Sequence, residues 1–103
     1  MLDADTIIAT LRAHRPELEA MGVRHAALFG SRARGDAGPE SDIDIGLRFA
    51  PEMSALGLRY FGLRQTVEDR LETLFAQPVD VSDEDMLRDT LKPFYERDKI
   101  LAF

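Results

Sequence analysis

The chain has 103 residues, a length that fits one domain, so we expect a single domain over residues 1–103. With 45% hydrophobic and 31% charged residues and no cysteine, the composition excludes wholesale disorder, collagen, a disulfide framework and thiolate zinc sites. The formal net charge of −6 argues against binding to a nucleic-acid backbone, and no apolar stretch is long enough for a membrane span, so we expect neither partner.

Two helical segments and a strand are expected in the first part of the chain. Apolar residues recur at helical spacing over 3–14, and Pro16 ends or kinks that helix. A short helical turn over 17–21 follows, and Gly22 is a suitable C-cap. Residues 23–29 form a short apolar run, which is typical of a buried strand. Acid rather than base stands at the N-terminus, so we expect no targeting peptide and a cytoplasmic protein.

The centre of the chain turns and then alternates. Residues 30–41 contain three glycines and one proline, so we expect turns there. Over 42–49, apolar side chains alternate with polar ones, which predicts a strand with one buried face.

A long helix is expected next, over 54–77. Its stripe recurs at steps of three or four and comprises Tyr60, Leu63, Val67, Leu71 and Leu74. Leu58, Phe61 and Phe75 lie off that stripe, so the helix is either covered on two sides or keeps an apolar face for a partner.

The last third of the chain predicts shorter elements. Residues 79–82 alternate as a short strand, and Ser82 or Asp83 would cap a helix running to about residue 89. Pro93 marks a break, and 94–103 would form a short helix or a tail. This order predicts a small α/β (α+β) fold, a mixed sheet flanked by helices.

Two carboxylates two residues apart suggest a metal site. On the strand over 42–49, Asp42 and Asp44 point to the same side, roughly 6.5 Å apart along the backbone. Mg²⁺ prefers oxygen ligands and is commonly held by one or two carboxylates plus substrate phosphates. The alternative for this pattern is an ordinary solvated strand face.

A glycine-containing turn precedes these acids. Gly30 and Ser31 directly follow a predicted strand, and a glycine there allows backbone N–H groups to approach an anion. Arg32 and Arg34 add positive charge nearby. The alternative is a simple glycine turn with a helix cap.

A third carboxylate, Asp80, lies between Val79 and Val81, so it should face away from the core. A metal would explain an acid in this apolar strand, and an edge strand facing water is the alternative. Three carboxylates beside a phosphate-binding turn are the apparatus for two-metal nucleotidyl transfer. Asp80 would then help to deprotonate the acceptor hydroxyl.

The motif formed by Gly30–Gly35 (GSRARG) and Ser41–Asp44 (SDID) resembles the signature of the DNA polymerase beta-like nucleotidyltransferases. In its short length the chain resembles their minimal branch, the MntA-like antitoxins of HEPN/MNT pairs. The resemblance implies a nucleotidyltransferase (DNA polymerase beta-like) fold, with ATP as the substrate and two Mg²⁺ ions at the active site.

The resemblance also implies residue roles and a partner. The implied catalytic and metal-binding residues are Asp42, Asp44 and Asp80. The implied nucleotide-binding residues are Gly30, Ser31, Arg32, Arg34 and Ser41. In that branch the enzyme transfers AMP from ATP to a tyrosine of a HEPN-type toxin and acts as the antitoxin of a type VII toxin–antitoxin pair.

Two other functions stay open. Small-molecule nucleotidyltransferases of the aminoglycoside-modifying kind carry a similar motif and an extra helical domain that binds the acceptor. The roughly 20 residues after Asp83 are too few for such a domain, unless a homo-oligomer supplies the missing wall of the acceptor site. A non-catalytic antitoxin would neutralise its partner by contact through Leu58, Phe61 and the C-terminal aromatics. The sequence does not choose between Mg²⁺ and Mn²⁺.

Overall fold

The structure, a computed structural model, describes residues 2–103. Its elements are α1 (Ala4–Ala13), α2 (Arg15–Ala20), β1 (Val23–Phe29), α3 (Gly30–Arg34), β2 (Ile43–Phe49), α4 (Pro51–Ser54), α5 (Arg59–Phe75), β3 (Val79–Asp83), the 3-10 turn η1 (Glu84–Met86), α6 (Lys92–Asp98) and β4 (Ile100–Leu101). Within these residues, no helix is both long and apolar enough to cross a membrane.

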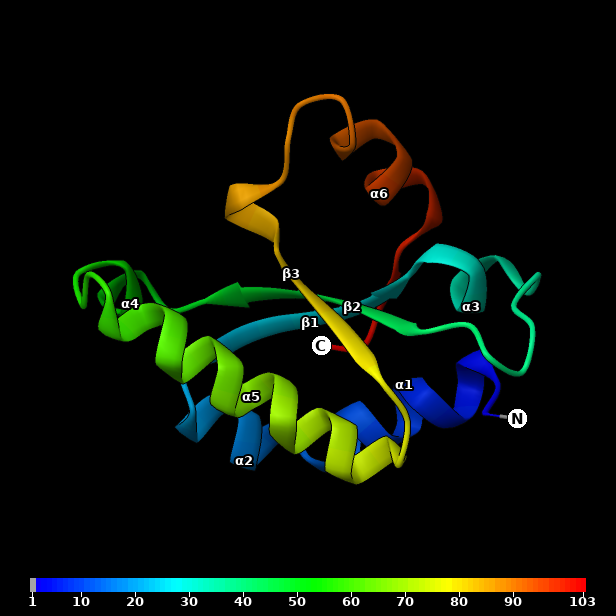
Figure 1. Cartoon of the computed structure of the whole chain (residues 1–103), viewed down its shortest axis with the longest axis horizontal. Helices are drawn as coiled ribbons and strands as arrows, with labels where there is room; N and C mark the ends of the chain where they lie inside the picture. The colour runs from blue at the N-terminus through cyan, green and yellow to red at the C-terminus, as the bar shows by residue number, and fades with distance from the viewer. Residues whose placement is uncertain (1) are drawn as a thin grey trace.

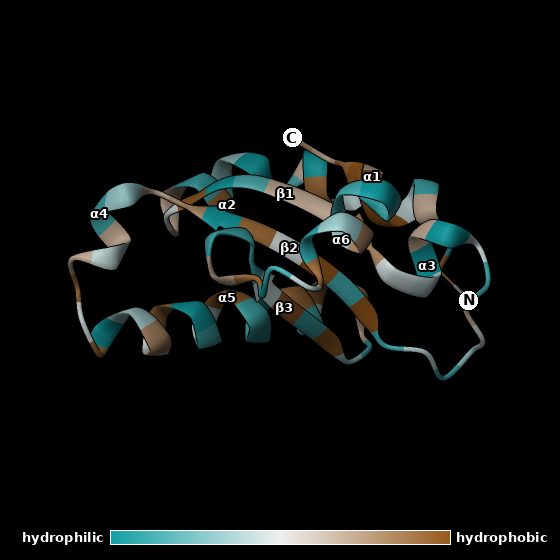
Figure 2. Cartoon of the chain, turned by 90° about the horizontal axis from the view of Figure 1, so that it is seen from above, coloured by the Kyte–Doolittle hydropathy of each residue, from teal (hydrophilic) through white to brown (hydrophobic). Residues whose placement is uncertain are grey.

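A four-stranded mixed sheet in the order β3-β2-β1-β4 forms the centre of the molecule (Figure 1). Helices α1, α2 and α5 cover one face, where their apolar side chains join those of the strands in a single core. Helix α6 lies over the opposite face. Figure 2 shows hydrophobic residues alternating with hydrophilic ones along β2 and β3. The mixed α/β fold class expected from the element order is confirmed.

The N-terminal elements follow the sequence prediction closely. Asp3 caps α1 by accepting a hydrogen bond of 2.8 Å from the backbone N–H of Thr6. Pro16 stands in the first turn of α2, where its missing N–H costs no intrahelical bond. The strand expected over 23–29 has the bounds of β1.

The pairing of the three longer strands places Phe29, Asp44 and Asp80 side by side across the sheet. β1 and β2 are antiparallel, with Phe29 opposite Asp44. β2 and β3 are parallel, with Asp44 opposite Asp80. On the core side of β2, Ile43, Ile45 and Leu47 are fully buried.

The alternation predicted that only one face of β2 is buried, but part of its second face is covered as well. Gly46 is buried on that face because Tyr95 of α6 packs over it. A Cβ at Gly46 would clash with the Tyr95 hydroxyl, so glycine is needed for this close approach.

The long helix begins later than its periodicity predicted. Residues near the expected start form the separate α4, and Gly57, with a φ of +60°, stands in the turn before α5. The sequence predicts Phe75 off the apolar stripe, but Phe75 is buried, because it continues the four-residue spacing of Val67 and Leu71. Leu58 and Phe61 are 87% and 54% exposed, which settles the alternative in favour of an uncovered apolar face.

The C-terminal third differs most from the prediction. The helix expected to follow Ser82 or Asp83 is only the turn η1, which Asp83 caps by accepting from the Asp85 N–H at 2.9 Å. The segment expected as a short helix or a tail contains α6 and then β4, which pairs antiparallel with β1. Strand β4 has two residues, too few for a visible alternation.

Candidate active site

Two of the three predicted carboxylates meet on the face of the sheet away from the helical core. Asp44 and Asp80 are paired residues of the parallel strands β2 and β3. Asp44 is partly buried and Asp80 is exposed, while the valines on either side of Asp80 are buried, as the alternation predicted. Both acids line a cavity of about 310 Å³ between the sheet, α3 and α6.

The electrostatics of Asp44 reflect this crowding. Burial, together with repulsion from Asp80 and Asp42, raises the pKa of the Asp44 carboxyl from 3.8 to about 6, while Arg34 opposes the change. Asp42 is exposed and does not line the cavity, yet its charge is felt at Asp44. Like charges held this close favour a cation between them.

Gly30 brings the start of α3 against the same carboxylate. Its φ of +72° lies in the left-handed region, and a Cβ at this position would clash with the Asp44 carboxylate. Glycine is therefore required for two independent reasons. The backbone of the predicted phosphate-binding turn thus reaches the acidic pair.

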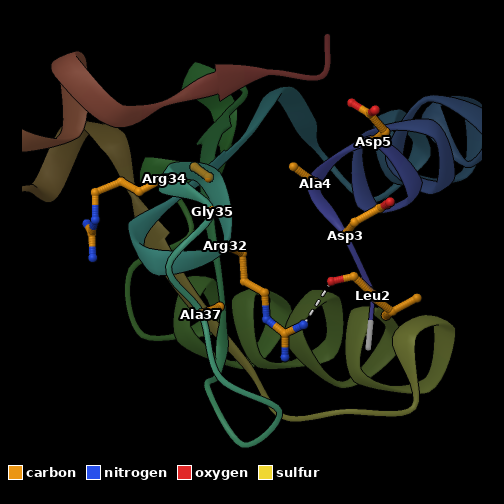
Figure 3. A pocket seen from close by; sticks show the side chains of 9 residues that line it. Leu2, Asp3, Ala4, Asp5, Arg32, Arg34, Gly35 and Ala37 are labelled. Atoms are coloured by element: carbon orange, nitrogen blue, oxygen red, sulfur yellow. Dashed lines mark hydrogen bonds between the residues drawn. The ribbon is translucent and has the colours of Figure 1, made fainter.

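The two arginines of the motif have different surroundings. Arg34 lines the cavity, and its guanidinium pairs with Asp36 at 3.1 Å and with Asp98 of α6 at 3.2 Å. Arg32 is only 3% exposed and lies away from the cavity. Figure 3 shows the two side chains leaving α3 in different directions, with Arg32 reaching Leu2.

The buried Arg32 side chain differs from its expected role as a nucleotide contact. Its guanidinium donates to the carbonyl oxygens of Leu2 and Ser41 at 2.9 and 2.7 Å, and to Gln77 Oε1 at 2.8 Å. These bonds tie together three segments that are distant in sequence. The structure therefore gives Arg32 a structural role, because both terminal nitrogens of its guanidinium donate inside the protein, while its buried Nε has no hydrogen-bond partner among the described residues.

The two serines of the motif, Ser31 and Ser41, have partners in their own loops. Ser31 is partly buried on α3, and its carbonyl accepts from the N–H groups of Gly35 and Asp36. The Ser41 hydroxyl accepts from the Gly38 N–H at 3.0 Å, which shapes the loop that enters β2. Neither serine lines the cavity that contains Asp44.

The donor set fits a cation that substrate phosphates help to hold. Among residues 2–103, no group of three or more His, Cys, Asp or Glu side chains is arranged to hold a metal ion alone. Mg²⁺, however, is usually bound by one or two carboxylates together with phosphate oxygens and water. The neighbouring carboxylates of Asp44 and Asp80, with the raised pKa of Asp44, match that requirement.

Side chains of α5 hold the strand that carries Asp80, a feature absent from the sequence prediction. Glu72 and Glu68 accept from the backbone N–H groups of Val79 and Val81, both at 3.2 Å. Arg64 donates to the Val81 carbonyl at 2.6 Å. These polar residues of α5 recur at steps of four, a spacing that could have indicated one polar stripe facing a common neighbour.

The far wall of the cavity was also missed. Its apolar residues come from the segment after η1 and from α6: Leu87, Leu91, Phe94 and Tyr95. No local pattern marks them, because α6 is short and the chain before it is irregular. Tyr95 is fixed by donating a hydrogen bond to Glu84, and burial raises its pKa.

Known proteins share this fold and sequence pattern. Residues 11–102 match the nucleotidyltransferase domain family. The protein adenylyltransferase MntA of Thermococcus cleftensis is 40% identical over 82 residues, which cover 79% of this chain and 77% of that protein. A solved structure described as a minimal nucleotidyltransferase matches with a TM-score of 0.75 and 27% identity, covering 96% of this chain and 95% of that one.

A toxin–antitoxin complex with AMP-PNP matches with a TM-score of 0.67 and 22% identity, covering 99% of this chain and 73% of that one, and this likeness shows the fold alone. The family match and the identity to MntA confirm the family expected from the motif. The chain therefore belongs to the nucleotidyltransferase domain family, in its minimal MntA-like branch, and is an enzyme of the nucleotidyltransferase type.

Proposed function

We propose that this enzyme transfers AMP from ATP to a tyrosine hydroxyl of a HEPN-type toxin in the cytoplasm, and thereby acts as the antitoxin of a type VII pair. The similar MntA protein is named a protein adenylyltransferase. A structural neighbour is a toxin–antitoxin complex with AMP-PNP. The observation that carries the proposal is the placement of Asp44 opposite Asp80, directly beside the Gly30 turn.

Three residues that line the cavity have roles in this reaction. Gly30 leaves room for the triphosphate beside Asp44, and Arg34 supplies positive charge at the same cavity. Asp80 is exposed and accepts the proton of the acceptor hydroxyl. The hydroxyl oxygen then bonds to the α-phosphorus of ATP, and the bond from that phosphorus to the pyrophosphate breaks.

A magnesium site would be formed by Asp44 and Asp80, with Asp42 as a third carboxylate. We assign two ions to the bound state, and they would neutralise phosphate charge that the acidic residues otherwise repel. Ser31 and Ser41 are proposed nucleotide contacts that would reach the phosphates through the backbone of their loops.

The test is transfer of labelled AMP from α-labelled ATP, with Mg²⁺, to the product of the neighbouring gene, using wild-type protein and the Asp80→Asn and Asp44→Asn variants. We expect label on the partner with wild type and at least about a hundredfold lower rate with each variant. Asp89→Asn, a change at an exposed side chain outside the cavity, is the matched control. Equal labelling by wild type and both cavity variants would refute the proposal, and transfer to kanamycin would favour the small-molecule alternative.

Neutralisation by contact alone is the second candidate, because the face that carries Leu58 and Phe61 is exposed and apolar. A double Leu58→Ser/Phe61→Ser variant should keep AMP transfer to a small test acceptor but lose toxin neutralisation if contact is sufficient. If the Asp44→Asn/Asp80→Asn variant still neutralises the toxin fully, contact rather than catalysis is the main mode.

A further inference from the structure

An exposed aromatic ring lies in the same cavity as the acidic pair. Phe94 of α6 is 56% exposed, and it lines the cavity together with Asp44 and Asp80. Leu87 and Leu91 extend the apolar wall on the same side. The cavity therefore has one charged wall and one apolar wall. A nucleoside triphosphate combines the same two properties, a charged chain and a flat aromatic base.

The other aromatic rings of this cavity are already engaged. Phe29 and Tyr95 pack edge to face, with 5.0 Å between their ring centroids. Tyr95 is also buried and bonded to Glu84. Phe94 instead keeps more than half of its surface free, with the guanidinium of Arg97 5.1 Å from its ring centroid.

Helix α6, which carries Phe94, is joined to the helix that begins at Gly30. Asp98, one turn after Phe94, accepts from Arg97 at 2.9 and 3.1 Å and from Arg34 of α3 at 3.2 Å. The bond from Arg34 links α6 to the helix that begins at Gly30. A helix positioned in this way needs little rearrangement to present Phe94 to a ligand beside Gly30.

We propose that Phe94 is the stacking surface for the purine base of ATP, while the triphosphate lies beside Gly30, Asp44 and Asp80. The inference rests on the proposed function, because it takes the nucleotide as the occupant of this cavity. Aromatic side chains stack on nucleic-acid bases without reading their edges, so Phe94 contributes affinity for the base and none for the phosphates.

The experiment compares two magnesium-complexed ligands, ATP and inorganic tripolyphosphate, by isothermal titration calorimetry. Tripolyphosphate carries the charge and lacks the base. The variants are Phe94→Ala, Phe94→Trp and the control Phe61→Ala, which removes a ring of similar exposure, 54%, outside this cavity. Circular dichroism and thermal melts establish that each variant is folded.

We expect Phe94→Ala to bind ATP about tenfold more weakly and tripolyphosphate within about twofold of wild type. Phe94→Trp should retain ATP binding, and Phe61→Ala should match wild type. Unchanged ATP affinity in Phe94→Ala would overturn the inference and would assign the apolar wall to the acceptor. Equal loss of both ligands would overturn it too, since the effect would then be structural. A wild-type protein that binds neither ligand would refute the proposed function and this inference with it.

Discussion

Replacing Asp44 with asparagine should stabilise the metal-free protein at neutral pH. In the folded chain, burial and the charges of Asp80 and Asp42 raise the pKa of Asp44 from 3.8 to about 6. Because one pKa unit is worth about 1.4 kcal/mol, the ionised carboxylate costs up to about 3 kcal/mol of folding free energy. Asp44 is partly exposed, so solvent screening reduces the expected cost to about 1–2 kcal/mol.

The sign of the pH dependence follows from proton binding. Between pH 3.8 and about 6 the folded chain holds more protons at Asp44 than the unfolded chain does, so the contribution of this group to stability falls as the pH rises through that window. Above it the cost is fully present. Asparagine removes the charge, so the gain should be large at about pH 7.5 and absent near pH 3.5.

Thermal unfolding followed by circular dichroism, without divalent ions, measures this effect. A gain of about 1–2 kcal/mol corresponds to a rise in Tm of about 5–10 °C for a domain of this size. Added Mg²⁺ should reduce the difference in Tm between Asp44→Asn and wild type, because it stabilises wild type more than the variant. Asp89→Asn, at an exposed side chain outside the cavity, is the control. A variant that is less stable than wild type at about pH 7.5, or whose gain is the same at both pH values, would refute the reasoning.

Three further predictions concern the scaffold. Gly30→Ala should lower the free energy of unfolding by about 1–2 kcal/mol in urea, because the backbone there is left-handed and a Cβ would clash with Asp44. Gly62→Ala, at an exposed position of α5, should raise it by about 0.5–1 kcal/mol, and changes of the same sign in both variants would contradict this reasoning. Arg32→Met should lose about 3 kcal/mol or more in the same assay, since three acceptors lose their donor, and a loss under about 0.5 kcal/mol would contradict the structural role. Tyr60→Phe should lose about 1–3 kcal/mol in thermal melts by removing a hydrogen bond to buried Asp83, and an unchanged Tm would argue against that bond.

The strand faces that carry Asp44 and Asp80 could be predicted from the sequence because alternation is a local signal, whereas Asp42, predicted to share their site, does not line the cavity. Alternation over 42–49 and around Asp80 assigns each side chain to a face of its strand, and a period of two leaves no other choice once one face is buried. The close approach of Gly30 to this pair was likewise expected from its place directly after β1.

The arginine roles could not be predicted from the sequence. Arg32 and Arg34 are two residues apart on a five-residue helix, and side chains at that spacing point in different directions. Which of them is buried depends on Leu2 and Gln77, which are far away in sequence. The bonds from α5 to β3 depend on tertiary packing in the same way.

By itself, the sequence determined the three longer strands, the strand faces that carry Asp44 and Asp80, the glycine turn and the family, since these depend on periodicity and on short motifs. Only the tertiary structure decided that α6 covers Gly46, that Phe94 borders the acidic pair and that two C-terminal residues complete the sheet. These features are contacts between segments distant along the chain. Their free energy comes from burial and hydrogen bonds that exist only after the sheet has formed, so no local pattern can encode them.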